Sequence, residues 1–371
     1  MNPNVRINKI SLTNFRNHKN TRIENTGTFM VLNGKNGSGK TNILEAISFF
    51  SPGRGIKNSS VMEIIRKSEN INSCEFNISI KYDTGEVDLK RYFSIDEKKG
   101  NYITIDDEKV NNSQLLDFVN IIWITPIMEK IMLQSNSEKR NFFDRLIFNV
   151  DKNHLKNHTK LQKLLSERLA LLKNYSYDKE WLSILENTIA ELSIKIMTNR
   201  KNFLFQLNKE LSKAIIPFGP CIIDMQHGIL NFETDINQIE LIESYRSILE
   251  STRKIDSELN RTTQNINKVK IEIYNNSKKN IEAKNCSTGE QKSILLSIFV
   301  AVARIIKLKN NGRSPIMLID EAMAHLDLAH KEYLFNELSN LESQVWLSGV
   351  SKELFNNINY QTVFIDMKNI V

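Results

Sequence analysis

Two short stretches far apart in the chain carry residues that can bind and hydrolyse a nucleotide. Residues 34–41, Gly-Lys-Asn-Gly-Ser-Gly-Lys-Thr, fit the phosphate-binding pattern G-x-x-x-x-G-K followed by Ser or Thr at all eight positions. Residues 316–321, Ile-Met-Leu-Ile-Asp-Glu, are an apolar run that ends in two adjacent carboxylates. The first stretch is suited to holding phosphates, and the second to holding Mg²⁺ and activating water. Together they predict an ATPase site.

The elements around the phosphate-binding stretch have the required order. Residues 29–33 are apolar and predict a buried strand, and residues 41–47 predict a helix. Glycines allow the turn between them, and the helix N-terminus favours bound negative charge. The pattern assigns the β- and γ-phosphates to Lys40 and Mg²⁺ to the Thr41 hydroxyl. A glycine-rich turn with a surface lysine is the alternative. The nucleotide-binding residues are predicted to be Gly34, Lys35, Asn36, Gly37, Ser38, Gly39, Lys40 and Thr41.

The acidic pair follows a strand that begins at Pro315, where the missing N–H group does no harm. Asp320 is placed to hold Mg²⁺, directly or through water, and Glu321 is the expected general base for the attacking water. With Lys40, Glu321 makes up the predicted catalytic pair. An ordinary strand followed by a solvated acidic pair is the alternative, and the phosphate-binding stretch argues against it.

Residues 287–291, Ser-Thr-Gly-Glu-Gln, resemble the signature motif of the ATP-binding-cassette superfamily, normally Ser-Gly-Gly-x-Gln. In that superfamily the serine and glycine cap the γ-phosphate held by the other subunit. Thr288 replaces the first glycine, so Ser287 and Gly289 are the better candidates for this contact, with Gln291 completing the motif. A polar cap before the buried helix predicted over residues 292–306 is the alternative.

Residues 324–327, Ala-His-Leu-Asp, resemble the D-loop of the same superfamily, which places Asp327 with the signature residues. Two of its other elements are weak. Ser348 and Gly349 stand where a switch histidine is often found, and residues 125–129 offer no Q-loop glutamine. We therefore expect slow hydrolysis, with the nucleotide acting as a conformational switch.

The composition is typical of an ordinary globular protein, with a positive net charge. The 371 residues are 40% hydrophobic and 25% charged, with a formal net charge of +7. No stretch is long and apolar enough to span a membrane, and the first ten residues lack the apolar core of a signal peptide. Three widely spaced cysteines show neither metal-ligand spacing nor a disulfide framework. A cytoplasmic location and no membrane partner are expected.

A basic stripe is predicted on one helix. Five leucines between residues 161 and 172 share one face of a helix over residues 152–172, which is typical of packing against a core. The opposite face carries Lys152, Lys156, Lys160 and Lys163. This face is either an ordinary solvated surface or a stripe that follows a phosphate backbone.

The chain is expected to fold as an α/β protein with two domains. Residues 1–125 and 281–371 form the ATPase head, and residues 126–280 form an inserted, mainly helical arm. Residues 1–10 alternate like an edge strand, and period-two runs from Cys74 to Val110 predict an antiparallel sheet joined to the head. Within the arm, a break at residues 217–220 precedes a predicted short strand pair over residues 222–232.

Over nearly its whole length the chain resembles the RecF family of bacterial recombination mediators. The more specific matches are the Phe-Arg-Asn, Pro-Gly-Arg-Gly and Arg-x-Phe-Phe-Asp-Arg stretches, whereas the phosphate-binding loop and the Asp-Glu pair are shared with many ATPases. The matching stretches are residues 12–18, 34–47, 51–55, 123–126, 137–145, 287–292 and 320–327.

This resemblance implies an ABC/SMC-type P-loop ATPase head with an antiparallel β subdomain and an arm, or lid. It implies an ATP- and Mg²⁺-dependent homodimer that clamps double-stranded DNA near gap junctions. It also implies RecR and RecO as partners in loading the RecA recombinase. Arg16 and Asn17 are further candidates for contacting the nucleotide. The rival interpretations are a transport or translation cassette ATPase and a scaffold that scarcely turns ATP over. A nuclease-fused relative is disfavoured, because only 50 residues follow the acidic pair.

Overall fold

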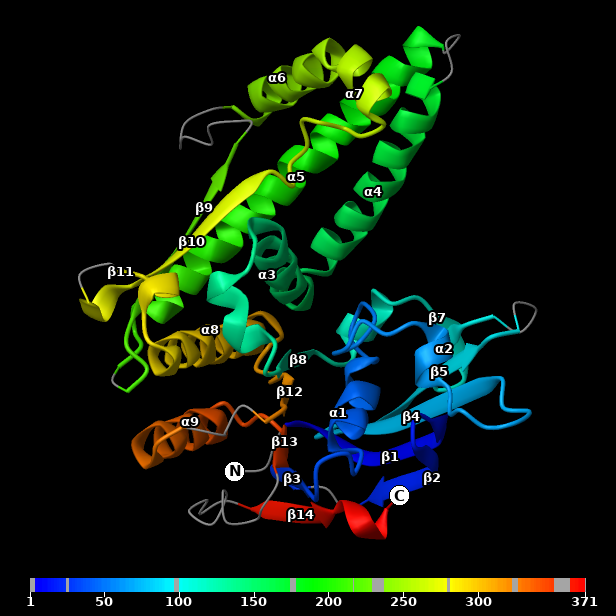
Figure 1. Cartoon of the computed structure of the whole chain (residues 1–371), viewed down its shortest axis with the longest axis vertical. Coiled ribbons are helices and arrows are strands. Elements are labelled where there is room, and N and C mark those ends of the chain that lie inside the picture. The colour runs from blue at the N-terminus through cyan, green and yellow to red at the C-terminus, as the bar shows by residue number, and fades with distance from the viewer. Residues whose placement is uncertain are drawn as a thin grey trace. The chain divides into compact units, whose positions relative to one another are not determined.

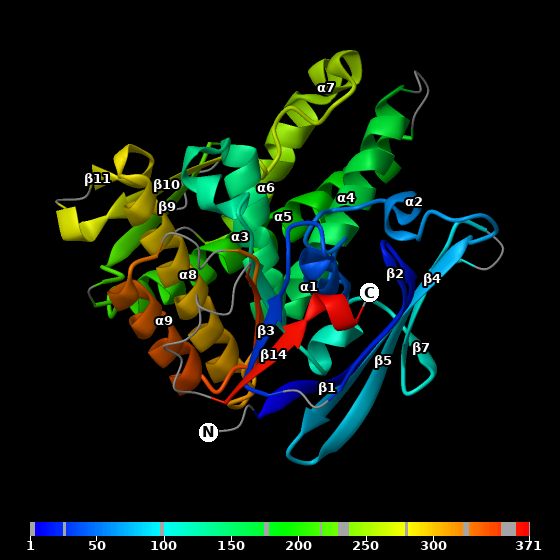
Figure 2. The ribbon, with the colours of Figure 1, turned by 60° about the horizontal axis from the view of Figure 1, so that its bottom comes forward.

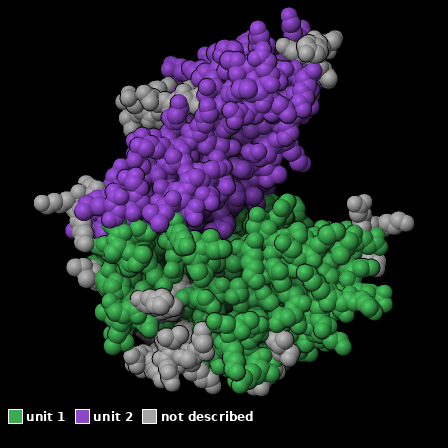
Figure 3. Space-filling view, viewed as in Figure 1, with its two compact units in different colours: residues 1–130, 213–220, 286–371 green, residues 131–212, 221–285 purple. Residues whose placement is uncertain are grey.

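The computed structural model describes residues 4–24, 27–96, 100–173, 178–215, 217–228, 237–278, 281–321, 326–349 and 361–370. By their contacts the residues divide into two compact units (Figure 3). The first unit holds residues 1–130, 213–220 and 286–371, and the second holds residues 131–212 and 221–285. The boundaries of the head and the arm stay a prediction. The sequence predicts residues 213–220 to lie in the arm, whereas by their contacts they belong to the first unit. Within the described ranges, no helix is long and apolar enough to cross a membrane.

A five-stranded parallel sheet lies in the first unit (Figure 1). Its order is β14-β3-β13-β12-β8, with β3 Phe29–Asn33, β8 Ile121–Ile124, β12 Ile316–Ile319, β13 Val345–Gly349 and β14 Thr362–Asp366. Gly349 lies beside Asn33, and Leu347 lies beside Ile319. The carboxyl ends of β3, β12 and β13 therefore meet at one edge, where the segments that follow can share a site.

The second sheet of this unit is antiparallel. Its order is β2-β1-β4-β5-β6-β7, with β1 Val5–Phe15, β2 His18–Glu24, β4 Ser73–Tyr82, β5 Gly85–Ser94, β6 Tyr102–Ile105 and β7 Glu108–Val110. The last four strands confirm the antiparallel sheet predicted from Cys74 to Val110. The expectation of an edge strand at the N-terminus was wrong, because β1 pairs with both β2 and β4. The chain turns back at Arg16 and Asn17, and β2 takes the edge.

Helices cover the two faces of the parallel sheet. Figures 1 and 2 show α1 and α8 on opposite sides of β3 and β13. The helices of this unit are α1 Lys40–Ser48, α2 Val61–Ile64, α8 Thr288–Lys309 and α9 Leu328–Asn340. The segment 213–220 is fixed to α8 and α9 by Phe218. The Phe218 ring contacts the Tyr333 ring edge-on, with the ring centroids 5.1 Å apart. The Phe218 carbonyl accepts a 2.9 Å hydrogen bond from Ser297 Oγ.

The second unit is mainly helical. Its elements are α3 Asn136–Val150, α4 Lys152–Lys173, α5 Lys179–Leu211, β9 Cys221–His227, α6 Gln238–Ser251, α7 Arg253–Leu259, β10 Val269–Asn275 and β11 Ile281–Glu282. Helix α4 confirms the helix predicted from residue 152, and Leu161 belongs to the buried core shared by α4, α5 and α6. Strand β9 confirms the first strand of the pair predicted over residues 222–232, and it pairs with β10, more than 40 residues further on. Residues 229–232 lie outside the described part of the chain.

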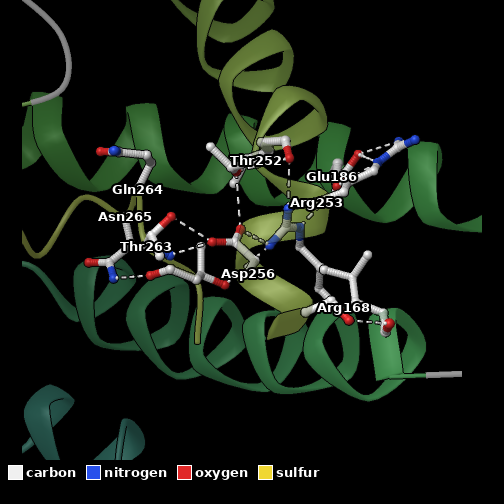
Figure 4. A network of polar contacts seen from close by, with 12 residues as sticks. Arg168, Glu186, Thr252, Arg253, Asp256, Thr263, Gln264 and Asn265 are labelled. Atoms are coloured by element: carbon white, nitrogen blue, oxygen red, sulfur yellow. Dashed lines mark hydrogen bonds and ion pairs between the residues drawn. The ribbon is translucent and has the colours of Figure 1, made fainter. Parts of the chain in front are cut away.

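A buried ionic network fastens the helices of the second unit together (Figure 4). Arg168, on α4, is fully buried. Its Nε donates to Glu186 Oε1 at 2.9 Å, its Nη1 to Asp256 Oδ2 at 2.7 Å, and its Nη2 to the Leu249 carbonyl at 2.7 Å. One guanidinium thus connects α4 with α5, α6 and α7.

Replacing Arg168 should be strongly destabilising. We expect Arg168→Met to lower the free energy of unfolding of this unit by about 3–5 kcal/mol, because Glu186 and Asp256 would stay buried without their main counter-charge. Urea unfolding followed by tryptophan fluorescence measures this, since Trp181 is the one tryptophan of the second unit.

Arg253 supplies the matched control. It also pairs with Glu186, at 2.5 Å, but its side chain is 18% exposed and hydration can replace part of the lost contact. Arg253→Met should therefore cost clearly less than Arg168→Met. Equal losses for the two variants would show that burial of the network does not set its contribution.

Candidate functional site

The phosphate-binding loop joins β3 to α1 and needs glycine at two positions for reasons of space. A Cβ atom on Gly34 would lie 2.7 Å from Ser38 Oγ. Gly39 caps α1 in the left-handed conformation, with φ +96°, and a Cβ there would lie 2.8 Å from Asn17 Nδ2. Ser38 Oγ is buried and makes no hydrogen bond within the described structure. A compact loop with an unsatisfied inward hydroxyl is suited to an anion.

Lys40 begins α1, and its ammonium group lies against this loop. The Nζ atom donates to the carbonyl of Gly34 at 2.8 Å and to the carbonyl of Lys35 at 3.0 Å. The residue is 4% exposed. The charge is therefore concentrated at the loop, where the pattern places the β- and γ-phosphates.

Thr41 and Asp320 bring two oxygen atoms together from distant parts of the sequence. Thr41 Oγ1 donates to Asp320 Oδ1 at 3.0 Å. The Asp320 amide donates to the Ile124 carbonyl at 2.9 Å, which fixes the residue at the end of β12. A hydroxyl and a carboxylate are ligands that Mg²⁺ prefers, and phosphate oxygens and water usually complete its coordination. These residues fit the expected Mg²⁺ site.

Ser348, on β13, is a site residue that the sequence did not identify as functional. Its Oγ donates to Asp320 Oδ1 at 2.7 Å and accepts the backbone N–H of Glu321 at 2.9 Å. In the sequence, Ser348 is notable only because it stands where a switch histidine is often found. Its position at the end of a strand parallel to β12 was the available signal. Glu321 itself is exposed and has a positive φ of 53°.

The signature residues form the N-terminal turn of α8. Ser287 caps the helix, and its side chain and that of Glu290 exchange capping hydrogen bonds with each other's backbone N–H groups. Ser287, Thr288 and Gly289 are exposed, and the space around the missing Cβ of Gly289 is open. Gln291 differs from them: it is buried, and its amide donates to the Cys286 carbonyl at 3.0 Å. Its side chain thus supports the turn from inside.

Arg16 and Asn17 lie beside the phosphate-binding loop, and the structure gives their side chains different partners. The Arg16 guanidinium makes two hydrogen bonds to the buried carboxylate of Glu45, at 2.9 and 2.6 Å. Asn17 Oδ1 accepts from Asn42 Nδ2 at 2.7 Å, and the Asn17 amide lies against Gly39. Arg16 is thus tied to α1, while Asn17 borders the loop. Nucleotide contact by either residue stays a prediction.

His18, which the sequence did not single out, also borders the loop. A Cβ on Gly39 would lie 3.0 Å from its Nε2 atom. Burial lowers the pKa of His18, and a contact with the Gly39 backbone opposes this only in part. The ring is therefore neutral at pH 7. It borders the anion site without adding charge, and only its proximity in the fold shows this.

The remaining cassette-like elements are partly described. Asp327 caps α9, and its Oδ1 accepts the His330 backbone N–H at 2.9 Å. Residues 324 and 325 of the predicted D-loop lie outside the described part of the chain. After β8, where the sequence offers no Q-loop glutamine, Glu129 pairs with Lys292 of α8 at 2.9 Å.

The four lysines of the predicted stripe, Lys152, Lys156, Lys160 and Lys163, are all exposed on α4. Exposure does not separate a phosphate-binding stripe from a solvated helix face.

Comparison with known proteins places this site in a family. The sequence profile of the RecF/RecN/SMC N-terminal domain matches residues 6–370. The chain is 35% identical to the DNA replication and repair protein RecF of Rickettsia prowazekii, over 95% of this chain and 97% of that protein. It is 34% identical to the protein of the same name from Rickettsia typhi, over the same shares.

Solved structures show the same fold. The structure of the recombination mediator protein RecF-ATP in the RecFOR pathway has a TM-score of 0.85 at 21% identity and covers 98% of each chain. An Smc head domain from Pyrococcus furiosus, with an extended coiled coil, has a TM-score of 0.54 at 19% identity and covers 98% of this chain and 94% of that one.

The fold and the site define a P-loop ATPase head of the SMC type, with an antiparallel sheet, a parallel sheet and a helical region. The chain belongs to the RecF/RecN/SMC N-terminal domain family, and within it to the RecF proteins. This relationship supports ATP binding and a role in DNA replication, repair and recombination.

Proposed function

We propose that this chain is an ATP-dependent DNA-binding protein of recombinational and replication-gap repair. It acts in the bacterial cytoplasm as a slow, DNA-stimulated ATPase whose nucleotide controls a clamp. The proposal rests on where the two halves of the predicted ATPase site lie within the first unit. The phosphate loop, Asp320 and Glu321 meet at one edge of the sheet, whereas the signature turn of α8 is exposed.

The residues at the sheet edge have distinct roles in the proposed reaction. The loop amides and Lys40 hold the phosphates, and Thr41 and Asp320 are the ligands for Mg²⁺. The metal would neutralise charge that develops on the transferred phosphoryl group. Glu321 accepts a proton from the attacking water. Its carboxylate is exposed in this structure, so the catalytic arrangement is completed only when a nucleotide and a partner cover it.

A second copy of the chain is the proposed partner. The first amides of a helix have no acceptor inside the helix, so the amides of Thr288 and Gly289 can donate to an anion, whereas the Ser287 amide already donates to Glu290. The open space at Gly289 lets a phosphate approach the backbone closely. We infer that Ser287 and Gly289 of one copy, with Thr288, Gln291 and Asp327 supporting them, close over the ATP held by the other.

Double-stranded DNA is the proposed ligand of the closed dimer. Exposed lysines on α4 can contact phosphates without reading sequence, which suits a clamp on double-stranded DNA at gap junctions. Two structural relatives are recombination mediator proteins of the RecFOR pathway. RecR and RecO are therefore the proposed protein partners, and loading of the RecA recombinase is the proposed outcome.

The mass of the purified protein in solution tests the clamp. We expect a shift from monomer to dimer with ATP and Mg²⁺, and retention of a gapped duplex by the dimer. A protein that stays monomeric and ignores DNA at saturating ATP would contradict the proposal and favour a cassette ATPase with a different partner.

The stripe on α4 makes a separate prediction. Replacing its four lysines, Lys152, Lys156, Lys160 and Lys163, by alanine should weaken DNA binding. Each lost phosphate contact should reduce the slope of log affinity against log salt by about 0.9, so four contacts reduce it by about 3–4. Fluorescence anisotropy at four salt concentrations measures the slope.

The matched control replaces the same four lysines by arginine. This variant keeps the charge and should keep the salt slope of the unchanged protein. An alanine variant with an unchanged slope would assign these lysines to a solvated helix face.

A further inference from the structure

One buried hydroxyl connects the two acidic residues of the site. Ser348 is 1% exposed, within β13 of the parallel sheet. Its Oγ lies 2.7 Å from Asp320 Oδ1 and 2.9 Å from the backbone nitrogen of Glu321. A hydroxyl has one proton to donate and lone pairs to accept. Because a carboxylate only accepts and an amide only donates, both directions are fixed.

The Asp320 carboxylate is fastened on two sides. Thr41 Oγ1 donates to the same oxygen, Oδ1, at 3.0 Å. The two donors come from α1 and β13, while Asp320 itself follows β12. The rotation of the carboxylate is therefore set by three elements of the fold, and Ser348 is the donor that comes from outside the phosphate-binding stretch.

Glu321 depends on the same hydroxyl for its backbone conformation. Its φ of 53° lies in the left-handed region, which residues with a side chain seldom adopt. Its amide follows the last residue of β12 by two positions and donates to the Ser348 hydroxyl. This bond satisfies the amide in the strained conformation, and the conformation determines where the carboxylate projects.

We propose that Ser348 is a positioning residue for ATP hydrolysis. It keeps Asp320 and Glu321 in a fixed relation, so that the carboxylate of the general base projects at a set distance from the metal ligand. The inference rests on the proposed ATPase reaction and deepens it. Ser348 does not touch the nucleotide in this account, and Thr41 still donates to Asp320 when Ser348 is changed, so Ser348 acts on turnover much more than on ATP affinity.

The variant Ser348→Ala removes both hydrogen bonds and only one atom. We expect ATP hydrolysis to fall about 10- to 100-fold, because a small displacement of a catalytic group costs up to about this factor. The affinity for a fluorescent ATP analogue with Mg²⁺ should stay within about threefold. Ser348→Thr retains the hydroxyl and should recover most of the lost turnover.

Two comparisons separate positioning from loss of packing. Ser343 is also fully buried, and its hydroxyl makes no hydrogen bond within the described structure, so Ser343→Ala should hydrolyse ATP like the unchanged protein. In a Glu321→Gln background, Ser348→Ala should lower hydrolysis little further, since residues that act as a unit are not additive.

A measurement without nucleotide tests the geometry itself. In Ser348→Ala the Glu321 amide loses its acceptor, so hydrogen exchange in the peptide that contains Asp320 and Glu321 should accelerate. Exchange as slow as in the unchanged protein would overturn the proposal. So would turnover within twofold of the unchanged protein, or a loss of ATP affinity that matches the loss of turnover. Failure of the proposed clamp looks different, because the unchanged protein would then form no dimer on DNA with ATP.

Discussion

Lys40→Ala should abolish ATP binding and, with it, the ATP-dependent dimer. The Lys40 ammonium lies at the phosphate-binding loop, 2.8 Å and 3.0 Å from two loop carbonyls. Each charge-assisted hydrogen bond to phosphate contributes about 1.5–3 kcal/mol. The variant would lose the two bonds expected from Lys40 to the β- and γ-phosphates, which weakens ATP binding by about 100-fold or more. Titration with a fluorescent ATP analogue measures the affinity, and light scattering with ATP measures the dimer.

The control for this prediction is another lysine of the same unit. Lys81 is exposed on β4 of the antiparallel sheet, and Lys81→Ala should bind ATP normally. If Lys40→Ala still dimerised with ATP, bridging by the bound nucleotide could not be what closes the clamp. Dimerisation would then have to be assigned to surfaces outside the site.

The sequence predicted most of the local structure because the signals were local. The phosphate-binding loop needs a strand before it and a helix after it, and β3 and α1 confirm both. The apolar run before Asp320 is β12, and the period-two runs from Cys74 to Val110 are antiparallel strands. In each case, residue spacing within about ten positions decides the element.

The contacts that complete the site depend on pairing between distant segments. Ser348 reaches Asp320 across 28 positions, and Arg16 reaches Glu45 across 29. No local sequence pattern around Ser348 or Arg16 predicts which residue its side chain will contact. Only the parallel alignment of β12 with β13, and the return of the chain beside α1, bring them together. These residues become identifiable only when the sheet order is known.

Arg168 shows the same limit inside the helical unit. Of the leucine face predicted on α4, Leu161 and Leu172 are buried and Leu164 and Leu165 are partly buried, yet the same helix also buries the guanidinium of Arg168 completely. Its carboxylate partners come from α5 and α7, 18 and 88 positions away. Periodicity identifies the face of a helix that is buried, whereas buried ion pairs depend on which helices meet there.

Glu321→Gln should separate ATP binding from ATP hydrolysis. Glutamine has nearly the same shape but cannot accept the proton of the attacking water at neutral pH. Loss of a general base costs about 100- to 10,000-fold in turnover. The metal ligands Thr41 and Asp320 stay in place, so ATP and Mg²⁺ should still bind. Hydrolysis should therefore nearly cease while the ATP-bound dimer accumulates on DNA.

Asp320→Asn gives the contrasting variant, because it alters a proposed metal ligand. It should weaken Mg²⁺-dependent ATP binding as well as turnover, and so should not accumulate a dimer. Measuring dimer lifetime on a gapped duplex after dilution of free ATP distinguishes the two. A Glu321→Gln protein that stays monomeric with saturating ATP would refute closure by the nucleotide. One that hydrolyses ATP at the unchanged rate would remove Glu321 as the base. The switch function would then have to rest on ATP binding and release alone.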